Sequence, residues 1–218
     1  MSNSLTEFMK IHFNNLTLRP PLFYSWSVGI RFEISKPGIQ HEDQGNLKQI
    51  EERIMGIFSK VFHDSDEVFL ITDIHCKSNN TFLHKRPTKI YQKYIKDKAL
   101  TLKLQHSVLP NVFTEHEEEM VTHQFTLSCK TSDIRYKQLL TAISYEDFPH
   151  PSQLLKRQNR AGIDVYFVNI TKKIIFHFYD DRGCDVIASN KEALHDLYKE
   201  RNDWILDYDR DKIDKLFH

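Results

Sequence analysis

The stretch FHFYDDRGCDVIASN, residues 176–190, brings together the side chains best suited to chemistry in this chain. Carboxylates beside a histidine can form an acid–base or metal cluster, and an arginine can hold an anion. If the protein is an enzyme, the candidate residues are His177, Asp181, Arg182 and Asp185. The alternative is a tight turn, in which Asp180 or Asp181 accepts hydrogen bonds from turn amides and Arg182 is solvated.

A β-hairpin is expected to position these side chains. Successive side chains of a strand face opposite sides, so His177 and Asp181 should share one face while Asp180 lies on the other. Gly183 is expected to adopt the positive φ that a two-residue hairpin turn requires. The polar residues should therefore gather around the turn.

The rest of the chain alternates between helical and extended patterns. Apolar residues at helical spacing predict helices at about 5–14, 46–62, 88–99, 132–148, 191–202 and 210–217. Alternating apolar residues predict strands at about 28–34, 67–76, 100–109, 121–130, 163–170, 174–181 and 184–189. The segment LRPPLFYSW should be extended, because consecutive prolines block a helix.

These patterns predict a fold class. The last three expected strands form a meander that is followed by a helix, and the other strands are interspersed with helices. We therefore expect an α+β fold with a mostly antiparallel mixed sheet. The length of 218 residues suits a single α+β domain over 1–218, with a division into subdomains 1–110 and 111–218 as the alternative.

Composition limits the function classes. Hydrophobic residues make up 40% of the chain and aromatic residues 12%, enough for a core. Thirty basic and thirty acidic side chains cancel, so nucleic acid is not an expected partner. The sequence shows no signal peptide and no apolar run of about 18 residues, and its three cysteines lack CxxC spacing. We expect a cytoplasmic protein with reduced thiols and no membrane association.

A second candidate site is the segment HKRPTKIYQKYIKDKALTLK, which carries seven basic residues against Asp97 alone. Basic side chains interleaved with tyrosines can bind phosphates and stack on bases. The alternative is a solvated helix face balanced by the acidic stretch that follows. We favour a protein partner with an acidic surface over nucleic acid. The expected contact residues are Lys85, Arg86, Lys89, Tyr91 and Lys93.

Metal and cofactor motifs are absent from the sequence. Asp207, Asp209 and Asp211 match the first spacings of an EF-hand loop, but Lys212 replaces the glycine and His218 replaces the bidentate glutamate. The sequence contains no HExxH, P-loop, GxGxxG or GxSxG motif. We therefore expect no metal and no cofactor.

Four segments carry a resemblance to a known family: LRPPLFYSWSVGIRFEI, DIRYKQLLTAI, VYFVNITKKIIFHFYDDRGCDVIA and LYKERNDWILDYDR. Over about residues 18–217 the chain resembles small cytosolic proteins of bacillus-like Gram-positive bacteria that are catalogued only as a domain of unknown function. The resemblance implies a bacterial cytosolic protein and assigns no residue a catalytic role.

Two functions follow from these observations. The favoured one is a non-catalytic protein-binding module, for example an immunity-type partner that occludes a toxin. The alternative is a small hydrolase, or an anion- or metal-binding enzyme, with its site at the hairpin Asp180–Asp185. The enzyme requires a concave pocket around Asp181 and Arg182, whereas a convex, solvated turn would exclude it.

Overall fold

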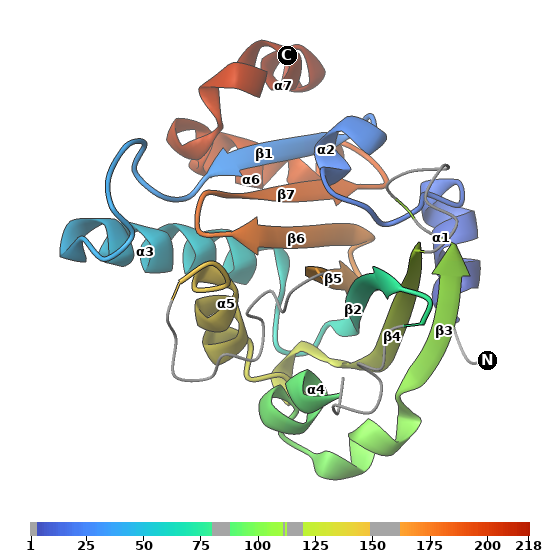
Figure 1. Cartoon of the computed structure of the whole chain (residues 1–218). Coiled ribbons are helices and arrows are strands. Elements are labelled where there is room, and N and C mark those ends of the chain that lie inside the picture. Colours follow the sequence, from blue (N-terminus) through green and yellow to red (C-terminus); the bar gives the residue numbers. More distant parts are fainter. Residues whose placement is uncertain (1–3, 80–87, 111, 113–119, 149–161) are drawn as a thin grey trace.

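One antiparallel sheet forms the centre of the structure, a computed structural model that describes residues 4–79, 88–110, 112, 120–148 and 162–218. Within these residues the sheet has seven strands in the order β1-β7-β6-β5-β2-β4-β3 (Figure 1). The strands are β1 (Gly29–Glu33), β2 (Glu67–Lys77), β3 (Gln105–Pro110), β4 (Met120–Lys130), β5 (Gly162–Asn169), β6 (Ile174–Asp180) and β7 (Gly183–Ala188). The predicted α+β fold with its C-terminal meander is confirmed.

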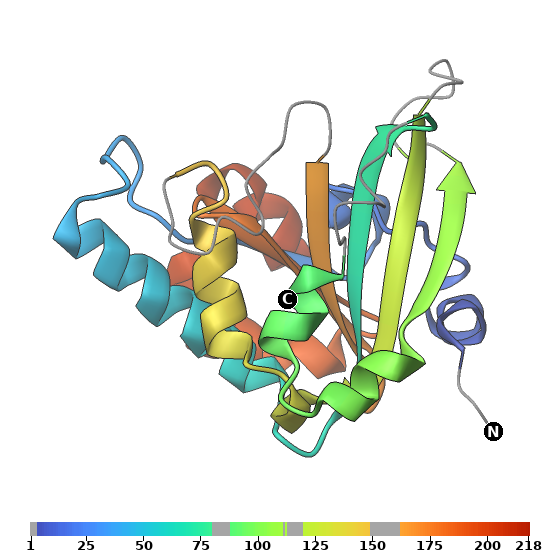
Figure 2. The ribbon, with the colours of Figure 1, turned by 60° about the horizontal axis from the view of Figure 1, so that its bottom comes forward.

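Helices cover both faces of the sheet. They are α1 (Leu5–Phe13), α2 (Leu22–Ser25), α3 (Gln44–Val61), α4 (Lys89–Tyr94), α5 (Tyr136–Ser144), α6 (His195–Glu200) and α7 (Arg210–Phe217). Figure 2 shows α3 and α5 on one side of the sheet and α1 on the other. Among the described residues, no helix combines the length and the apolar character needed to cross a membrane.

Alternation along the strands separates the core into two layers. Leu70, Phe167 and Phe176 lie opposite one another on β2, β5 and β6 and face the α3 side. Phe58 of α3 packs edge-on against the last two rings, with centroids 5.0 and 5.4 Å away. Phe69 belongs to the smaller layer under α1. Both faces of the central strands are therefore buried at this end.

Two segments differ from the sequence prediction. The strand expected from residue 100 begins at Gln105, because the preceding residues form the 3₁₀ helix η2 (Lys98–Lys103). The Asp97 carboxylate starts η2 by accepting a hydrogen bond of 2.9 Å from the Ala99 amide. The segment expected to be extended contains the single turn α2, which begins immediately after Pro21. Proline is compatible with a helix start, where no amide donor is needed.

Gly183 is required for a different reason from the one predicted. Among the described glycines, positive φ occurs at Gly38 and not at Gly183, which corrects the expectation of a positive-φ turn residue. A Cβ atom on Gly183 would lie 2.8 Å from the main-chain oxygen of Phe32. The glycine thus allows β1 to approach β7, where Glu33 pairs with Gly183.

Candidate functional site

The β6–β7 turn is closed by Asp180. Its carboxylate accepts hydrogen bonds from the main-chain amide of Arg182 at 2.8 Å and from the Arg182 Nε at 2.9 Å. This is the turn geometry that the sequence offers as the alternative to a catalytic cluster. The Arg182 side chain is 74% exposed, and its charge is paired with the Asp180 carboxylate.

A pocket of about 620 Å³ lies beside this turn. Its lining residues are Phe32, Glu33, Ser35, Lys36, Pro37, Gly38, Ile39, His41, Asp147, Phe148, Tyr179, Asp181, Arg182 and Leu206. The walls come from the β1–α3 loop, the β6–β7 turn and the residues after α5. Asp181 is only 9% exposed. Asp181 and Arg182 therefore line a concave surface, as the enzyme alternative requires.

His41 is the pocket residue that the sequence did not single out. Its Nε2 donates a hydrogen bond of 3.0 Å to the main-chain oxygen of Ser144, an atom that can only accept. The ring stacks on Phe148, with centroids 3.9 Å apart and planes 15° from parallel. The neutral ring is thereby fixed with its lone pair on Nδ1, which has no hydrogen-bond partner among the described residues.

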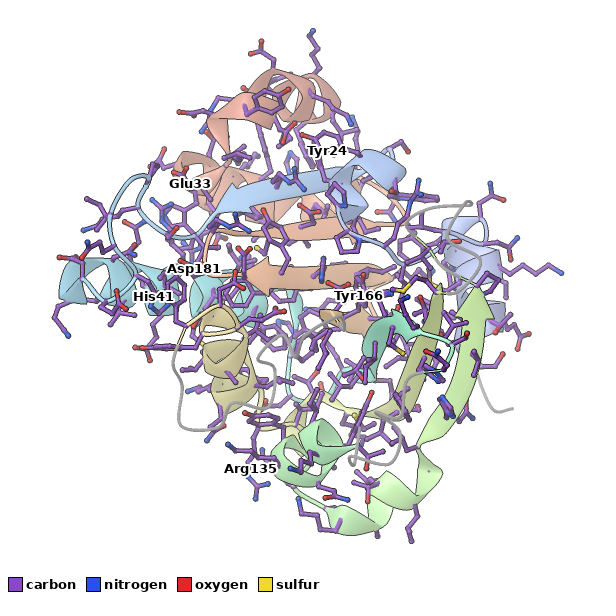
Figure 3. All side chains as sticks on the ribbon, in the orientation of Figure 1. Tyr24, Glu33, His41, Arg135, Tyr166 and Asp181 are labelled. Atoms are coloured by element: carbon purple, nitrogen blue, oxygen red, sulfur yellow. The ribbon has the colours of Figure 1, made fainter. Side chains whose placement is uncertain are left out.

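The carboxyl group of Asp181, which lines the pocket, has a raised pKa. Burial raises its pKa above the usual range for aspartic acid, and the neighbouring Asp180 carboxylate adds to this effect. His41 and Arg182 act in the opposite direction, which shows that both lie within electrostatic reach of Asp181. Figure 3 labels His41 and Asp181 near the end of β6 where the chain turns into β7.

The other two hairpin candidates lie on the sheet face instead of in the pocket. His177 and Asp185 are direct neighbours across β6 and β7. The Asp185 carboxylate accepts hydrogen bonds from the Arg31 Nε at 2.8 Å and from the Phe23 amide at 3.1 Å. Asp185 therefore ties α2 and β1 to β7. The four candidates are divided between two places, so the single cluster expected around the turn is corrected.

His177 belongs to a buried polar group that spans the strands. Its Nε2 donates a hydrogen bond of 3.2 Å to the Asp164 carboxylate, which also accepts a bond of 2.9 Å from the His75 Nε2. Asp73 lies on β2 directly opposite Asp164. A sequence signal existed for this group, because Asp73 and His75 interrupt the apolar run VFLITDIHC.

The basic segment is divided by burial. Lys89 and Lys93 of α4 are exposed, whereas Tyr91 is fully buried. The Tyr91 hydroxyl donates a hydrogen bond of 2.7 Å to the main-chain oxygen of Phe125. The expectation that Tyr91 contacts a partner is therefore wrong, since its side chain fastens α4 to the sheet. Lys85 and Arg86 lie outside the described residues.

The C-terminal aspartates make structural contacts. Asp209 precedes α7, but its carboxylate accepts a hydrogen bond of 2.9 Å from the Tyr24 hydroxyl instead of capping the helix. In the part of the chain that the structure describes, no group of three or more His, Cys, Asp or Glu side chains is arranged to hold a metal ion.

Comparisons with known proteins give a family and no activity. A family model described as "Domain of unknown function (DUF3885)" matches residues 5–209. The chain is 34% identical over 213 residues to "Uncharacterized protein YnaE" of Bacillus subtilis (strain 168), which covers 94% of this chain and 98% of that protein. No solved structure matches. The resemblance to an uncharacterised family of bacillus-like bacteria is confirmed.

Proposed function

Since this chain belongs to the family described as "Domain of unknown function (DUF3885)", we propose its function from the geometry of the site: the pocket at the β6–β7 turn binds a small polar substrate and catalyses its hydrolysis. One observation carries this proposal. His41, with its tautomer fixed by Ser144, and Asp181, with its buried carboxyl group, line the same pocket.

The two side chains have complementary roles in this proposal. Nδ1 of His41 accepts the proton, because Nε2 already donates to Ser144. Nδ1 is buried in this structure, so the ring must be uncovered before water can reach it. Asp181 donates a proton to the leaving group, because burial raises the pKa of its carboxyl group and keeps more of it protonated. Lys36 and Arg182 line the pocket, but so do Glu33, Asp147 and Asp181. Arg182 is also ion-paired with Asp180, so the charge of the pocket does not select an anionic substrate.

The test is turnover of small chromogenic substrates by purified protein. We expect slow hydrolysis of p-nitrophenyl acetate or p-nitrophenyl phosphate that falls at least tenfold in His41→Gln and in Asp181→Asn. Asp211→Asn is the matched control, because that side chain is exposed on α7 and does not line the pocket. Equal turnover in all three variants would show that the pocket does not catalyse the reaction.

A protein partner is the second candidate, and the edge strand β3 supports it. Within the described residues β3 pairs with β4 alone, at the end of the sheet. Val108 is 56% exposed, and Leu102 in the preceding η2 is 87% exposed. A partner could add a strand to this edge, and the lysines of η2 favour an acidic one. This keeps the protein-binding hypothesis, including an immunity-type partner.

The edge can be tested by a single substitution. Ser107→Pro should abolish co-purification of a protein partner, because proline removes an amide from the edge and its ring obstructs strand addition. Thr101→Pro in η2 is outside β3 and serves as the control. A partner retained equally by both variants would exclude β3 as its contact. We propose the cytoplasm as the compartment, because Cys76, Cys129 and Cys184 are unpaired thiols.

A further inference from the structure

Two carboxylates face each other on the sheet face opposite α3. Asp73 of β2 and Asp164 of β5 are direct cross-strand partners, a position in which like charges destabilise a sheet. The negative charge of Asp164 is stabilised by two histidine hydrogen bonds. Although burial opposes its ionisation, hydrogen bonds from His177 and His75 hold the pKa of Asp164 well below its usual range. The negative charge of this pair therefore resides on Asp164.

The Asp73 carboxyl group has fewer hydrogen-bond donors than that of Asp164. Its side chain is almost fully buried, and Oδ1 accepts a hydrogen bond of 3.0 Å from the Gln124 Nε2. Oδ2 has no hydrogen-bond partner among the described residues. A buried carboxyl oxygen without a donor is costly, by about 1–3 kcal/mol for a neutral group. This oxygen can therefore accept a hydrogen bond from a donor outside the chain.

Two further buried atoms on this face have no partner in the described part of the chain: the Tyr166 hydroxyl and the His177 Nδ1. Tyr166 is a cross-strand partner of both Ile71 and His177, and its ring stacks on His177 with centroids 4.4 Å apart. Burial, and then the charges of Asp164, Asp73 and Asp185, raise the pKa of Tyr166. Its side chain lies on the same sheet face as those of Asp164 and Asp73. Figure 3 labels Tyr166 over the middle of the sheet.

The three atoms match one ligand chemistry. Asp73 Oδ2, Tyr166 Oη and His177 Nδ1 can all accept a hydrogen bond, the last because Nε2 donates to Asp164. A primary ammonium group offers three N–H donors and a positive charge. We propose that this sheet face is a binding site for a small primary amine, with its ammonium group held by Asp73, Tyr166 and His177. The site is separate from the pocket at the β6–β7 turn and does not depend on its proposed activity.

Solvent reaches the edge of this site at the start of β5. The Asp164 side chain is 16% exposed. Gly162 presents no side chain, and a Cβ atom there would have its nearest neighbour, the His75 Cδ2, 4.0 Å away. The three acceptor atoms themselves lie below the surface, so we place the entry of the amine at this end of β5, where Asp164 meets solvent.

Binding of an ammonium group should release a proton from Asp73. The groups that face Asp73 are His75 on its own strand, Gln124 on β4, Asp164 on β5 and His177 on β6. Burial raises the pKa of Asp73 to about 7, so the free site is protonated below that pH. The amine pairs with the ionised carboxylate. Its affinity should fall about fivefold from pH 7 to pH 6 and about tenfold for each further pH unit.

The test is titration of the protein with methylammonium chloride. The NMR signals of the Asp73 and Asp164 carboxyl carbons report binding. We expect saturable shifts whose affinity weakens about fivefold from pH 7 to pH 6. Tetramethylammonium chloride at the same concentration should give no saturable shift, because it has no N–H donor. A response that is identical for both salts, or absent for methylammonium, would overturn the proposal.

Two variants make the test specific. Asp73→Asn keeps an oxygen for Gln124 and removes the charge, and should abolish saturation. Tyr166→Phe removes one acceptor and should weaken binding about tenfold, and it tests the site independently if Asp73→Asn does not fold. Asp211→Asn, a charge change on the exposed part of α7, should bind like the unchanged protein. Unchanged binding in both site variants would show that the amine binds elsewhere.

Discussion

The imidazole of His41 is hydrogen-bonded to the main chain of Ser144 at 3.0 Å, which joins the loop before α3 to the last turn of α5. The two residues are about 100 positions apart in the sequence, so only the tertiary fold brings them together. Their contact closes one wall of the pocket and orients the ring at the same time.

Replacing His41 by phenylalanine should remove the hydrogen bond to Ser144 and keep the ring stacking. The aromatic ring can still stack on Phe148, whereas the buried Ser144 oxygen loses its donor. We expect the free energy of unfolding to fall by about 1–3 kcal/mol, the cost of an unsatisfied buried acceptor. Urea denaturation measures this directly. An unchanged midpoint would show that the bond contributes nothing to stability.

Asp73 should impose a pH dependence on stability. The pKa is about 7 in the folded protein and about 3.9 in an unfolded chain, so folding is favoured where the folded carboxyl group is protonated. This contribution is complete below pH 4 and is lost as the pH rises to 7, a change of roughly 4 kcal/mol by the difference in pKa. Asp73→Asn should therefore gain stability relative to the unchanged protein between pH 4 and pH 7.

The measurement is urea unfolding of both proteins across that range. Asp211→Asn is the control, since its exposed carboxylate should leave the pH profile unaltered. A constant difference between Asp73→Asn and the unchanged protein at every pH would contradict the prediction.

Gly183→Ala should be strongly destabilising. The new Cβ would lie 2.8 Å from the Phe32 oxygen, a main-chain atom that cannot move without shifting β1. We expect a loss of about 2–4 kcal/mol. Gly38→Ala, at a φ of +71° with no neighbouring atom within 4 Å, should cost only about 1 kcal/mol. Equal losses in thermal unfolding would mean that β1 adapts to the extra methyl group.

Arg31→Met should cost more than the loss of an exposed ion pair. The methionine fills the space beside β7, but the fully buried Asp185 carboxylate loses its cation. Removing one partner of a buried pair typically costs about 3–5 kcal/mol. Lys60→Met at the exposed pair with Glu200 should cost much less, because solvent screens that pair. Chemical denaturation of the two variants compares them; similar losses would show that Asp185 is compensated by other donors.

Hydrophobic periodicity is enough to predict the fold class. The alternation of apolar residues predicts the central strands, and it places Asp180 and His177 on opposite faces of one strand. The site was less accessible to sequence reasoning. His41 is remote from Asp181 in the chain and stands in a loop without periodic signal, so nothing in its neighbourhood indicated a shared pocket. The prediction for Tyr91 is wrong because its basic neighbours suggest a surface, whereas its side chain is buried against the sheet.

The pairing of β1 with β7 has a consequence for the order in which the protein is made. Residues 29–33 are synthesised about 150 residues before their strand partner at 183–188. The pairs β3–β4, β5–β6 and β6–β7 join consecutive strands, whereas β1 cannot pair until β7 has been made. Such a long-range contact raises contact order and slows folding. An unfinished chain would present β1 as an unpaired strand to cellular chaperones.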